Sequence, residues 1–258
     1  MGLDMQFSAN LGFLWNDQPL PDAIHKAKAA GFAGVELHWP YATPATDVAD
    51  ALRDTGLPCL GLNTQRGDVA AGDNGCTAIP GREAEARDYI DEALAYADAI
   101  GAGAVHVMAG FTDKGEAAQA TFTDNLTYAC AEAAKRGKTI LIEPLNAYDA
   151  PGYHHGTLNE ALAAREKVAA DNLKIMFDCY HLQIMGGDLL RNIKVNLDAI
   201  GHIQFAAVPD RGEPDQGEVD YQWLLHEIEA LGWQTPFGAE YKARSTTDAG
   251  IGWLDAYR

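Results

Sequence analysis

The chain has 258 residues, of which 47% are hydrophobic and 22% charged, as is typical of a globular protein with a substantial core. Its formal net charge of −18 argues against a nucleic-acid partner, because affinity for phosphate backbones comes mainly from Lys and Arg. No apolar run approaches the roughly 20 residues of a membrane helix, and the N-terminal segment does not resemble a signal peptide. Four scattered cysteines, without a C-x-x-C pair, fit a reducing cytoplasm, so we expect a cytoplasmic protein without a membrane partner.

Short apolar runs alternate with longer amphipathic stretches along the chain. The runs predict eight strands, near Met5–Ala9, Gly34–His38, Cys59–Asn63, Ala104–Met108, Thr139–Glu143, Lys174–Asp178, His202–Ala206 and Phe237–Glu240. The stretches between them predict helices. Apolar residues recur every three or four positions in Glu83–Ile100, which marks one buried helix face, and Trp223, Leu224, Ile228 and Leu231 repeat this pattern.

Several predicted helices are followed by a glycine just before the next strand. These glycines are Gly31, Gly101, Gly137 and Gly232. Glycine suits the left-handed residue that ends a helix.

Eight strands alternating with about as many helices are typical of a closed parallel barrel. A doubly wound open sheet is the main alternative. It usually has a glycine-rich phosphate turn after its first strand, and neither G-x-G-x-x-G nor a Walker A sequence occurs here. Because no linker divides the chain, we predict an α/β fold with one (β/α)8 TIM-barrel domain over residues 1–258.

Polar side chains stand at the ends of four consecutive predicted strands: Glu143, Asp178, Gln204 and Glu240. In barrels the carboxyl ends of the strands carry the active site. One carboxylate at such a position is often only a helix N-cap, but four oxygen-bearing side chains on neighbouring strands favour a shared pocket. Buried like charges repel one another, and a hard divalent cation such as Mg²⁺ or Mn²⁺ relieves that repulsion.

Further candidates lie near the ends of the other strands. His106 ends the fourth strand, and Glu36 and His38 end the second; each is as often a core residue as a site residue. Asn63 and Arg66, near the end of the third strand, are candidates for contact with substrate. The aromatic residues Trp15, Trp39 and Tyr41 follow the first two strands and are candidates for the pocket wall or for simple packing. The long segments Gln65–Arg82 and Pro144–Gly156 should belong to the active-site face, with His154 and His155 exposed.

The chain resembles the hydroxypyruvate isomerase family, within the wider xylose-isomerase-like barrel superfamily. The resemblance spans nearly the whole chain and is carried by IEPLN (142–146), FDCYHLQ (177–183), GHIQFAAVPDRGEPDQGEVDY (201–221) and AEYK (239–242). It implies a TIM-barrel isomerase that interconverts hydroxypyruvate and 2-hydroxy-3-oxopropanoate (tartronate semialdehyde). A small homo-oligomer is also expected from the resemblance.

The resemblance also implies roles for individual residues. Glu143, Asp178, Gln204 and Glu240 fall on the metal-binding positions, with Mg²⁺ expected and Mn²⁺ as the alternative. Glu143 and Glu240 match the glutamates that move protons. His181, Arg211 and Glu213 match substrate-side positions, and His106 and Lys242 are added as substrate-binding candidates from their places near strand ends.

The expected chemistry needs these residue types. Moving a proton between adjacent carbons through an enediolate requires an acid or base on each carbon and positive charge near the oxygens. Two carboxylates beside a metal ion supply these parts. The anionic end of a hydroxy-carbonyl acid calls for a cation, and Arg211 offers a bidentate fork.

Four alternatives remain open. The segment VHVMAG is similar to 2-oxo-tetronate isomerases, which act on a substrate one carbon longer. Sugar 3-epimerases of the superfamily carry histidine where this chain has Gln204, which disfavours them. Nucleic-acid repair, by analogy with endonuclease IV, needs a basic groove. A non-catalytic sugar-acid binding protein would need no paired glutamates such as Glu143 and Glu240.

Overall fold

Eight parallel strands pair in chain order and close into a barrel, because β1 pairs with both β2 and β8. The computed structural model describes residues 5–257. The strands are β1 (Phe7–Asn10), β2 (Gly34–Leu37), β3 (Cys59–Asn63), β4 (Ala104–His106), β5 (Thr139–Ile142), β6 (Leu173–Asp178), β7 (Ile200–Phe205) and β8 (Phe237–Ala239). All eight predicted strands are therefore confirmed, with small shifts of their ends.

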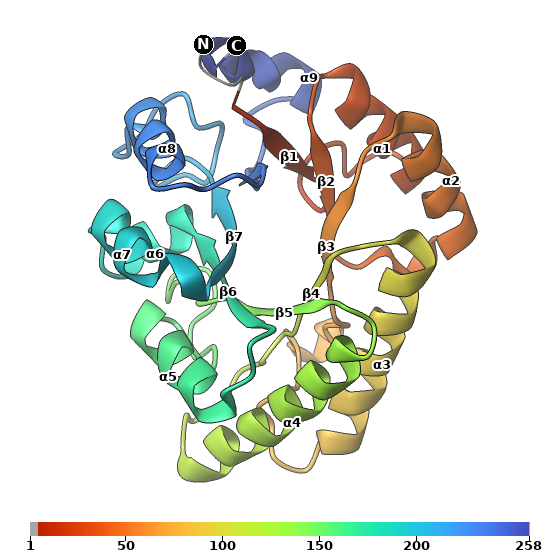
Figure 1. The fold of residues 1–258 in the computed structure, drawn as a ribbon, viewed down its shortest axis with the longest axis vertical. Helices are drawn as coiled ribbons and strands as arrows, with labels where there is room; N and C mark the ends of the chain where they lie inside the picture. The colour runs from red at the N-terminus through yellow and green to blue at the C-terminus, as the bar shows by residue number, and fades with distance from the viewer. Residues whose placement is uncertain (1–4, 258) are drawn as a thin grey trace.

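The helices surround the strands, as Figure 1 shows. The α-helices are α1 (Leu20–Ala29), α2 (Ala45–Thr55), α3 (Glu83–Ile100), α4 (Glu116–Ala134), α5 (Leu158–Val168), α6 (Cys179–Met185), α7 (Leu189–Asn196), α8 (Tyr221–Ala230) and α9 (Thr247–Gly250). Short 3₁₀ segments are η1 (Pro40–Ala42), η2 (Val69–Ala71), η3 (Leu197–Ala199) and η4 (Ile251–Tyr257). The predicted TIM barrel is confirmed, with two α-helices, α6 and α7, between β6 and β7.

Helix ends follow the predicted glycine rule. Gly101 ends α3 with φ of +73°, and Gly137 precedes β5 with φ of +65°. A residue with a Cβ is strained at such angles, so glycine ends these helices at low cost and lets the chain re-enter the sheet.

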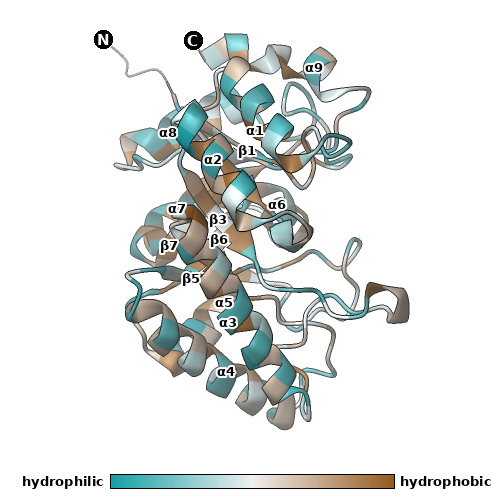
Figure 2. Ribbon diagram, turned by 90° about the vertical axis from the view of Figure 1, so that its right-hand side faces the viewer, coloured by the Kyte–Doolittle hydropathy of each residue, from teal (hydrophilic) through white to brown (hydrophobic). Residues whose placement is uncertain are grey.

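The helices bury one face against the strands, and most strand residues are buried. Figure 2 shows the resulting pattern, with hydrophobic strands inside and mixed helices outside. On α3 the predicted apolar face is buried, from Ala86 to Ile100. On α8 the prediction for Trp223 was wrong: its side chain is 55% exposed, because Leu224, Leu225 and Ile228 form the inward stripe and Trp223 lies outside it.

The last described segment packs against the first strand. The ring of Phe7 in β1 lies 5.0 Å from Trp253 and 5.0 Å from Tyr257, both in η4. Over residues 5–257, no helix is long and apolar enough to cross a membrane. The four cysteines are buried and free, as their scattered positions predict.

Candidate active site

The carboxyl ends of β5 to β8 bring the four predicted oxygen donors into one region. Glu143 directly follows β5, Asp178 is the last residue of β6, Gln204 lies in β7 and Glu240 directly follows β8. The strand register aligns Asp178 with Gln204 and Gln204 with Gly238. All four side chains are buried and thus lie in a region of low dielectric constant.

Asp178 serves the local fold and the site at once. Its Oδ1 accepts a hydrogen bond of 2.9 Å from the backbone N–H of Tyr180 and so caps α6. Its Oδ2 has no hydrogen-bond partner among the described residues. The cap fixes the rotamer of the carboxylate, and α6 in turn carries His181 back toward it.

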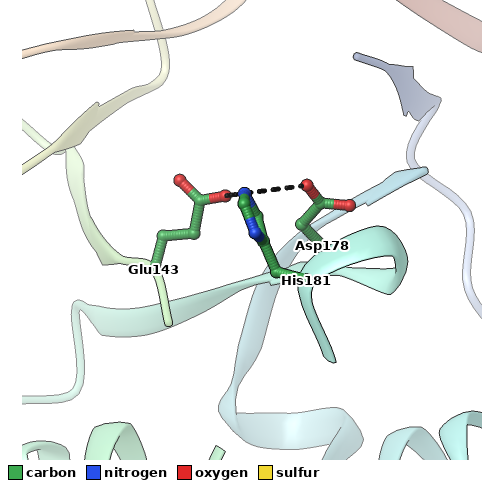
Figure 3. A group of neighbouring side chains, drawn as sticks. All are labelled: Glu143, Asp178 and His181. Carbon is green, nitrogen blue, oxygen red and sulfur yellow. Dashed lines mark ion pairs between the residues drawn. The ribbon is translucent and has the colours of Figure 1, made fainter. Parts of the chain in front are cut away.

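Glu143, Asp178 and His181 form a group that fits a divalent metal ion. One ligand atom from each lies within 4.8 Å of the others. Nε2 of His181 stands 3.8 Å from Oε1 of Glu143 and 3.6 Å from Oδ2 of Asp178, between the two carboxylates in Figure 3. We predicted His181 as a substrate-side residue, and the geometry brings it into the group of potential ligands.

Three buried oxygens of this region lack hydrogen-bond partners among the residues that the structure describes. They are Oε1 of Glu143, Oδ2 of Asp178 and Oε1 of Gln204. A buried acceptor without a partner costs free energy, and oxygen atoms are the preferred ligands of hard cations such as Mg²⁺. The residues present therefore fit a divalent metal ion.

Burial and mutual repulsion raise the pKa of two of the carboxyls. Burial raises the pKa of Glu143 well above its ordinary value, and the charges of Glu240 and Asp178 raise it further. Burial, together with the charge of Glu240, raises the pKa of Asp178 to about 7. Such shifts are typical of functional sites, where carboxyl groups exchange protons near neutral pH.

Arg211 places a positive charge among these carboxylates. Its Nη2 lies 2.8 Å from Oε1 of Glu240 and 3.7 Å from Oδ2 of Asp178. The guanidinium stacks over Phe13 at 4.7 Å and Tyr180 at 4.9 Å from the ring centroids. Its backbone is left-handed, with φ of +55°, an unfavourable angle for a side-chain-bearing residue, as is often found at functional sites.

His106 reaches the same region from β4. Its Nδ1 lies 3.7 Å from Oε2 of Glu143 and 3.3 Å from Oδ1 of Asn63. Burial and the neighbouring His38 lower the pKa of His106 to about 3, which keeps the ring neutral. His106 is thus suited to hydrogen bonding rather than to ion pairing.

A second polar network lies beside the oxygen donors and contains Glu36, which the sequence offered as a candidate without its partners. Glu36 in β2 accepts hydrogen bonds from Oγ of Ser8, at 2.6 Å, and from Nε2 of Gln204, at 2.7 Å. Nε2 of His202 lies 3.0 Å from its Oε1. Although burial alone would raise it, the charge and hydrogen bonding of His202 lower the pKa of Glu36.

A cavity of about 370 Å³ opens between these groups. Its lining includes Glu36, His106, Glu143, His181, Gln204, Arg211 and Glu240. The long loops contribute as predicted, because Asn74 comes from the segment after β3 and Asp149 from the segment after β5. Of the aromatic candidates, Trp39 lines this cavity, whereas Trp15 lines a neighbouring hollow.

Two predicted substrate-side residues lie apart from the cavity lining. Both carboxylate oxygens of Glu213 accept hydrogen bonds of 3.1 Å from the backbone N–H of Arg244, which ties the loop after β7 to the loop after β8. Lys242 is exposed and lines the neighbouring hollow with Trp15. Their predicted contact with substrate stays a prediction.

The expectation for His154 and His155 was wrong, because both are buried. The ring of His155 stacks on Phe122 of α4 at 5.3 Å, and Nδ1 of His154 lies 2.8 Å from Oγ1 of Thr112. Burial lowers the pKa of His154 to about 4 and that of His155 to about 3. These histidines anchor the base of the loop after β5.

Comparison with known proteins places these features in a family context. Residues 24–257 match the family model described as xylose isomerase-like TIM barrel. The chain is 43% identical to the 2-oxo-tetronate isomerase of Cupriavidus necator, with 98% of both chains covered. It is 39% identical to the hydroxypyruvate isomerase of Escherichia coli, over 98% of this chain and 100% of the other.

Solved structures share the architecture. A crystal structure from Brucella melitensis, described as an AP endonuclease of family 2, is 40% identical with a TM-score of 0.94, covering 98% of this chain and 99% of that one. A 3-keto-D-glucoside 4-epimerase from Escherichia coli is 20% identical with a TM-score of 0.80, over 98% of this chain and 99% of the other, and shares the fold.

Proposed function

The chain belongs to the xylose isomerase-like TIM-barrel family and is an isomerase, and on this premise we propose that it interconverts hydroxypyruvate and 2-hydroxy-3-oxopropanoate. The observation that carries the proposal is the convergence of two buried glutamates, Glu143 and Glu240, on a cavity that also holds one buried guanidinium, that of Arg211. Two carboxylates suit a proton transfer between adjacent carbons, and the guanidinium suits an anionic substrate.

The reaction needs one group that removes a proton and one that delivers a proton, and we assign these roles to Glu143 and Glu240. One carboxylate removes a proton from C3 of hydroxypyruvate, which gives an enediolate, and the other carboxyl delivers a proton to C2. A further proton passes from the C3 hydroxyl to the C2 oxygen, so that the aldehyde and the secondary alcohol form. The raised pKa of Glu143 supports this role, because burial and the neighbouring carboxylates make its carboxylate a stronger base than an exposed glutamate.

The substrate carboxylate would be held by Arg211. Its guanidinium forms charge-assisted, paired hydrogen bonds with a carboxylate, and its stacking on Phe13 and Tyr180 fixes its plane. His106 and His181 line the cavity and are proposed to hold the hydroxyl and carbonyl oxygens as neutral donors. Burial, together with Arg211 and His106, lowers the pKa of His181 well below its ordinary value, which supports a neutral ring.

We propose Mg²⁺ as the metal, with Mn²⁺ as a substitute, held by Glu143, Asp178, Gln204 and Glu240, with His181 beside them. An all-oxygen set suits these hard cations, and the unpartnered oxygens of Glu143, Asp178 and Gln204 support it. When bound, such an ion would supply Lewis acidity to the substrate oxygens. The four free, buried cysteines support a reducing compartment such as the cytoplasm.

A second candidate is 2-oxo-tetronate, which carries the same reacting carbons in a longer chain. The higher identity to the isomerase of that substrate, 43% against 39%, favours it. Nucleic-acid repair is not proposed, although one similar structure carries an endonuclease title, because a net charge of −18 opposes binding to phosphate backbones.

The deciding experiment follows both acids by proton NMR in D₂O, with chelator-treated protein and with Mg²⁺ or Mn²⁺ added back. We expect metal-dependent conversion of one acid, with solvent deuterium entering the new C–H bond because the carboxyls exchange their protons with solvent. Turnover of neither acid, by protein that binds Mn²⁺, would overturn the proposed substrate class.

A further inference from the structure

We propose that Glu36 is the positioning residue of Gln204: it holds the amide nitrogen and thereby directs the amide oxygen into the carboxylate cluster. The proposal deepens the function above and rests on it, because it treats Gln204 as a ligand of the metal ion. Glu36 lies in β2 and Gln204 lies in β7, which is not a neighbouring strand. The hydrogen bond between them joins residues 168 positions apart in the sequence.

Hydrogen-bond chemistry fixes the orientation of the amide. Nε2 of Gln204 donates to Oε2 of Glu36 at 2.7 Å. An ionised carboxylate only accepts hydrogen bonds, so turning the amide around would set two oxygens against each other with no proton between them. Oε1 of Gln204 must therefore point away from Glu36, and it is one of the buried oxygens that lack a partner within residues 5–257.

Glu36 is itself held in place by its other oxygen. Oε1 accepts a hydrogen bond of 2.6 Å from Ser8 and lies 3.0 Å from Nε2 of His202. His202 and Gln204 are two residues apart in β7 and face the same side of the strand. The imidazole and the amide thus approach different oxygens of one carboxylate.

The neighbouring strand leaves room for this network. A Cβ at position 238 in β8 would lie 2.5 Å from Oε1 of Glu36, 2.7 Å from Cγ of Gln204 and 2.7 Å from Nε2 of His202. Real Cβ atoms do not approach other atoms so closely. Glycine at 238 is therefore a condition for the amide, carboxylate and imidazole to meet.

The other role open to Glu36 is that of an acid or base in turnover, since it also lines the cavity. Metal affinity and kcat distinguish the two roles. A positioning residue sets the affinity for the metal ion in the absence of substrate, whereas an acid or base sets kcat at saturating metal.

The test measures Mn²⁺ binding to the full chain by calorimetry, without substrate. We expect Glu36→Ala to weaken Mn²⁺ binding about 10- to 100-fold, as is typical when a partner of a ligand is lost. Ser8→Ala is the matched control, because it removes a hydrogen bond to the other oxygen of the same carboxylate and should change the affinity by less than about threefold.

A swap tests the direction of the hydrogen bond. Gln204→Glu alone should weaken Mn²⁺ binding, although it adds a negative charge, because two carboxylates then face each other. The double variant Glu36→Gln/Gln204→Glu restores a donor opposite an acceptor and should recover most of the affinity. Recovery by the swap is not expected if Glu36 only stabilises the fold.

Each outcome decides one point. Wild-type protein that binds no Mn²⁺ contradicts the proposed metal site itself. Wild-type protein that binds Mn²⁺, with a folded Glu36→Ala variant that binds it equally well, overturns the positioning role. If Glu36→Ala does not fold, the swap decides: a double variant no better than Gln204→Glu overturns the proposal. Lower kcat in Glu36→Gln with unchanged Mn²⁺ affinity makes Glu36 an acid or base and also overturns it.

Discussion

The guanidinium of Arg211 lies 2.8 Å from the carboxylate of Glu240, inside the group of residues that we propose as metal ligands. The same nitrogen lies 3.7 Å from Asp178. Arg211 therefore neutralises carboxylates that a metal ion would also neutralise. When metal and substrate bind, the guanidinium is expected to exchange these partners for the carboxylate of the substrate.

This exchange gives Arg211→Gln two opposite effects. KM for the acid should rise about 10- to 100-fold, because a charged hydrogen bond contributes about 1.5–3 kcal/mol. Affinity for Mn²⁺ should stay the same or increase, because a competing cation is removed. Steady-state kinetics and calorimetry measure the two effects. Lys242→Ala is the control, since the exposed Lys242 lies outside the cavity lining and should leave KM unchanged. An unchanged KM in Arg211→Gln would place the carboxylate clamp elsewhere.

Glu143→Gln and Glu240→Gln should each lower kcat by about 10²- to 10⁴-fold at saturating Mn²⁺. The amide has nearly the same shape as the carboxylate but neither accepts nor delivers the proton. Circular dichroism should show an unchanged fold, and calorimetry should report how much of the loss comes from weaker metal binding. Activity within a few-fold of wild type in either variant would be inconsistent with a two-glutamate mechanism.

The raised pKa of Asp178 predicts a pH dependence of stability in the metal-free protein. Burial raises this pKa from 3.8 to about 7. The resulting stabilisation is present below the unfolded value and is lost as the pH rises through the folded value. The Tm of chelator-treated protein should therefore fall from about pH 4 to about pH 7 relative to that of Asp178→Asn, which has no such proton to lose and still caps α6.

Added Mn²⁺ should restore the Tm most strongly at the high end of this range, because the ion binds the ionised carboxylate. Differential scanning calorimetry at several pH values measures both effects. Parallel pH profiles for wild type and Asp178→Asn would show that Asp178 does not titrate as expected.

His106 should remain neutral throughout the working range. Its pKa of about 3 means that its ring signals in a proton NMR titration should not move between about pH 5 and pH 8. Because this pKa lies below the ordinary 6.5, the associated stabilisation is present above about pH 6.5 and is lost as the pH falls toward 3. A His106→Asn variant assigns the signals, and a midpoint near 6.5 would contradict the neutral ring.

The barrel and its oxygen donors were predictable because both follow from short local patterns. Each buried strand is an apolar run of a few residues, and a polar residue at its carboxyl end stands out, as Glu143 does after TILI. The rule that barrel sites lie at these ends then brings Glu143, Asp178, Gln204 and Glu240 together without knowledge of any contact.

Contacts between distant strands could not be predicted in this way. The sequence offers Glu36 as a candidate near the end of the second strand, but its partner Gln204 lies 168 residues later. The burial of His154 and His155 was equally hidden, because it depends on Phe122 of α4, which packs against the polar loop after β5. For Glu36, the available sequence signal is a single charged residue within a buried strand. A buried charge needs a partner, but the sequence does not say which residue supplies it.

Closure of the barrel makes assembly depend on the far end of the chain. Phe7 of β1 pairs in register with Phe237 of β8, and its ring packs on Trp253 and Tyr257. During synthesis, the edge of β1 that pairs with β8 therefore stays unpaired until almost the whole barrel has been made. Such long-range pairing slows folding, and the open β1 edge is a place where an incomplete chain would associate with other copies.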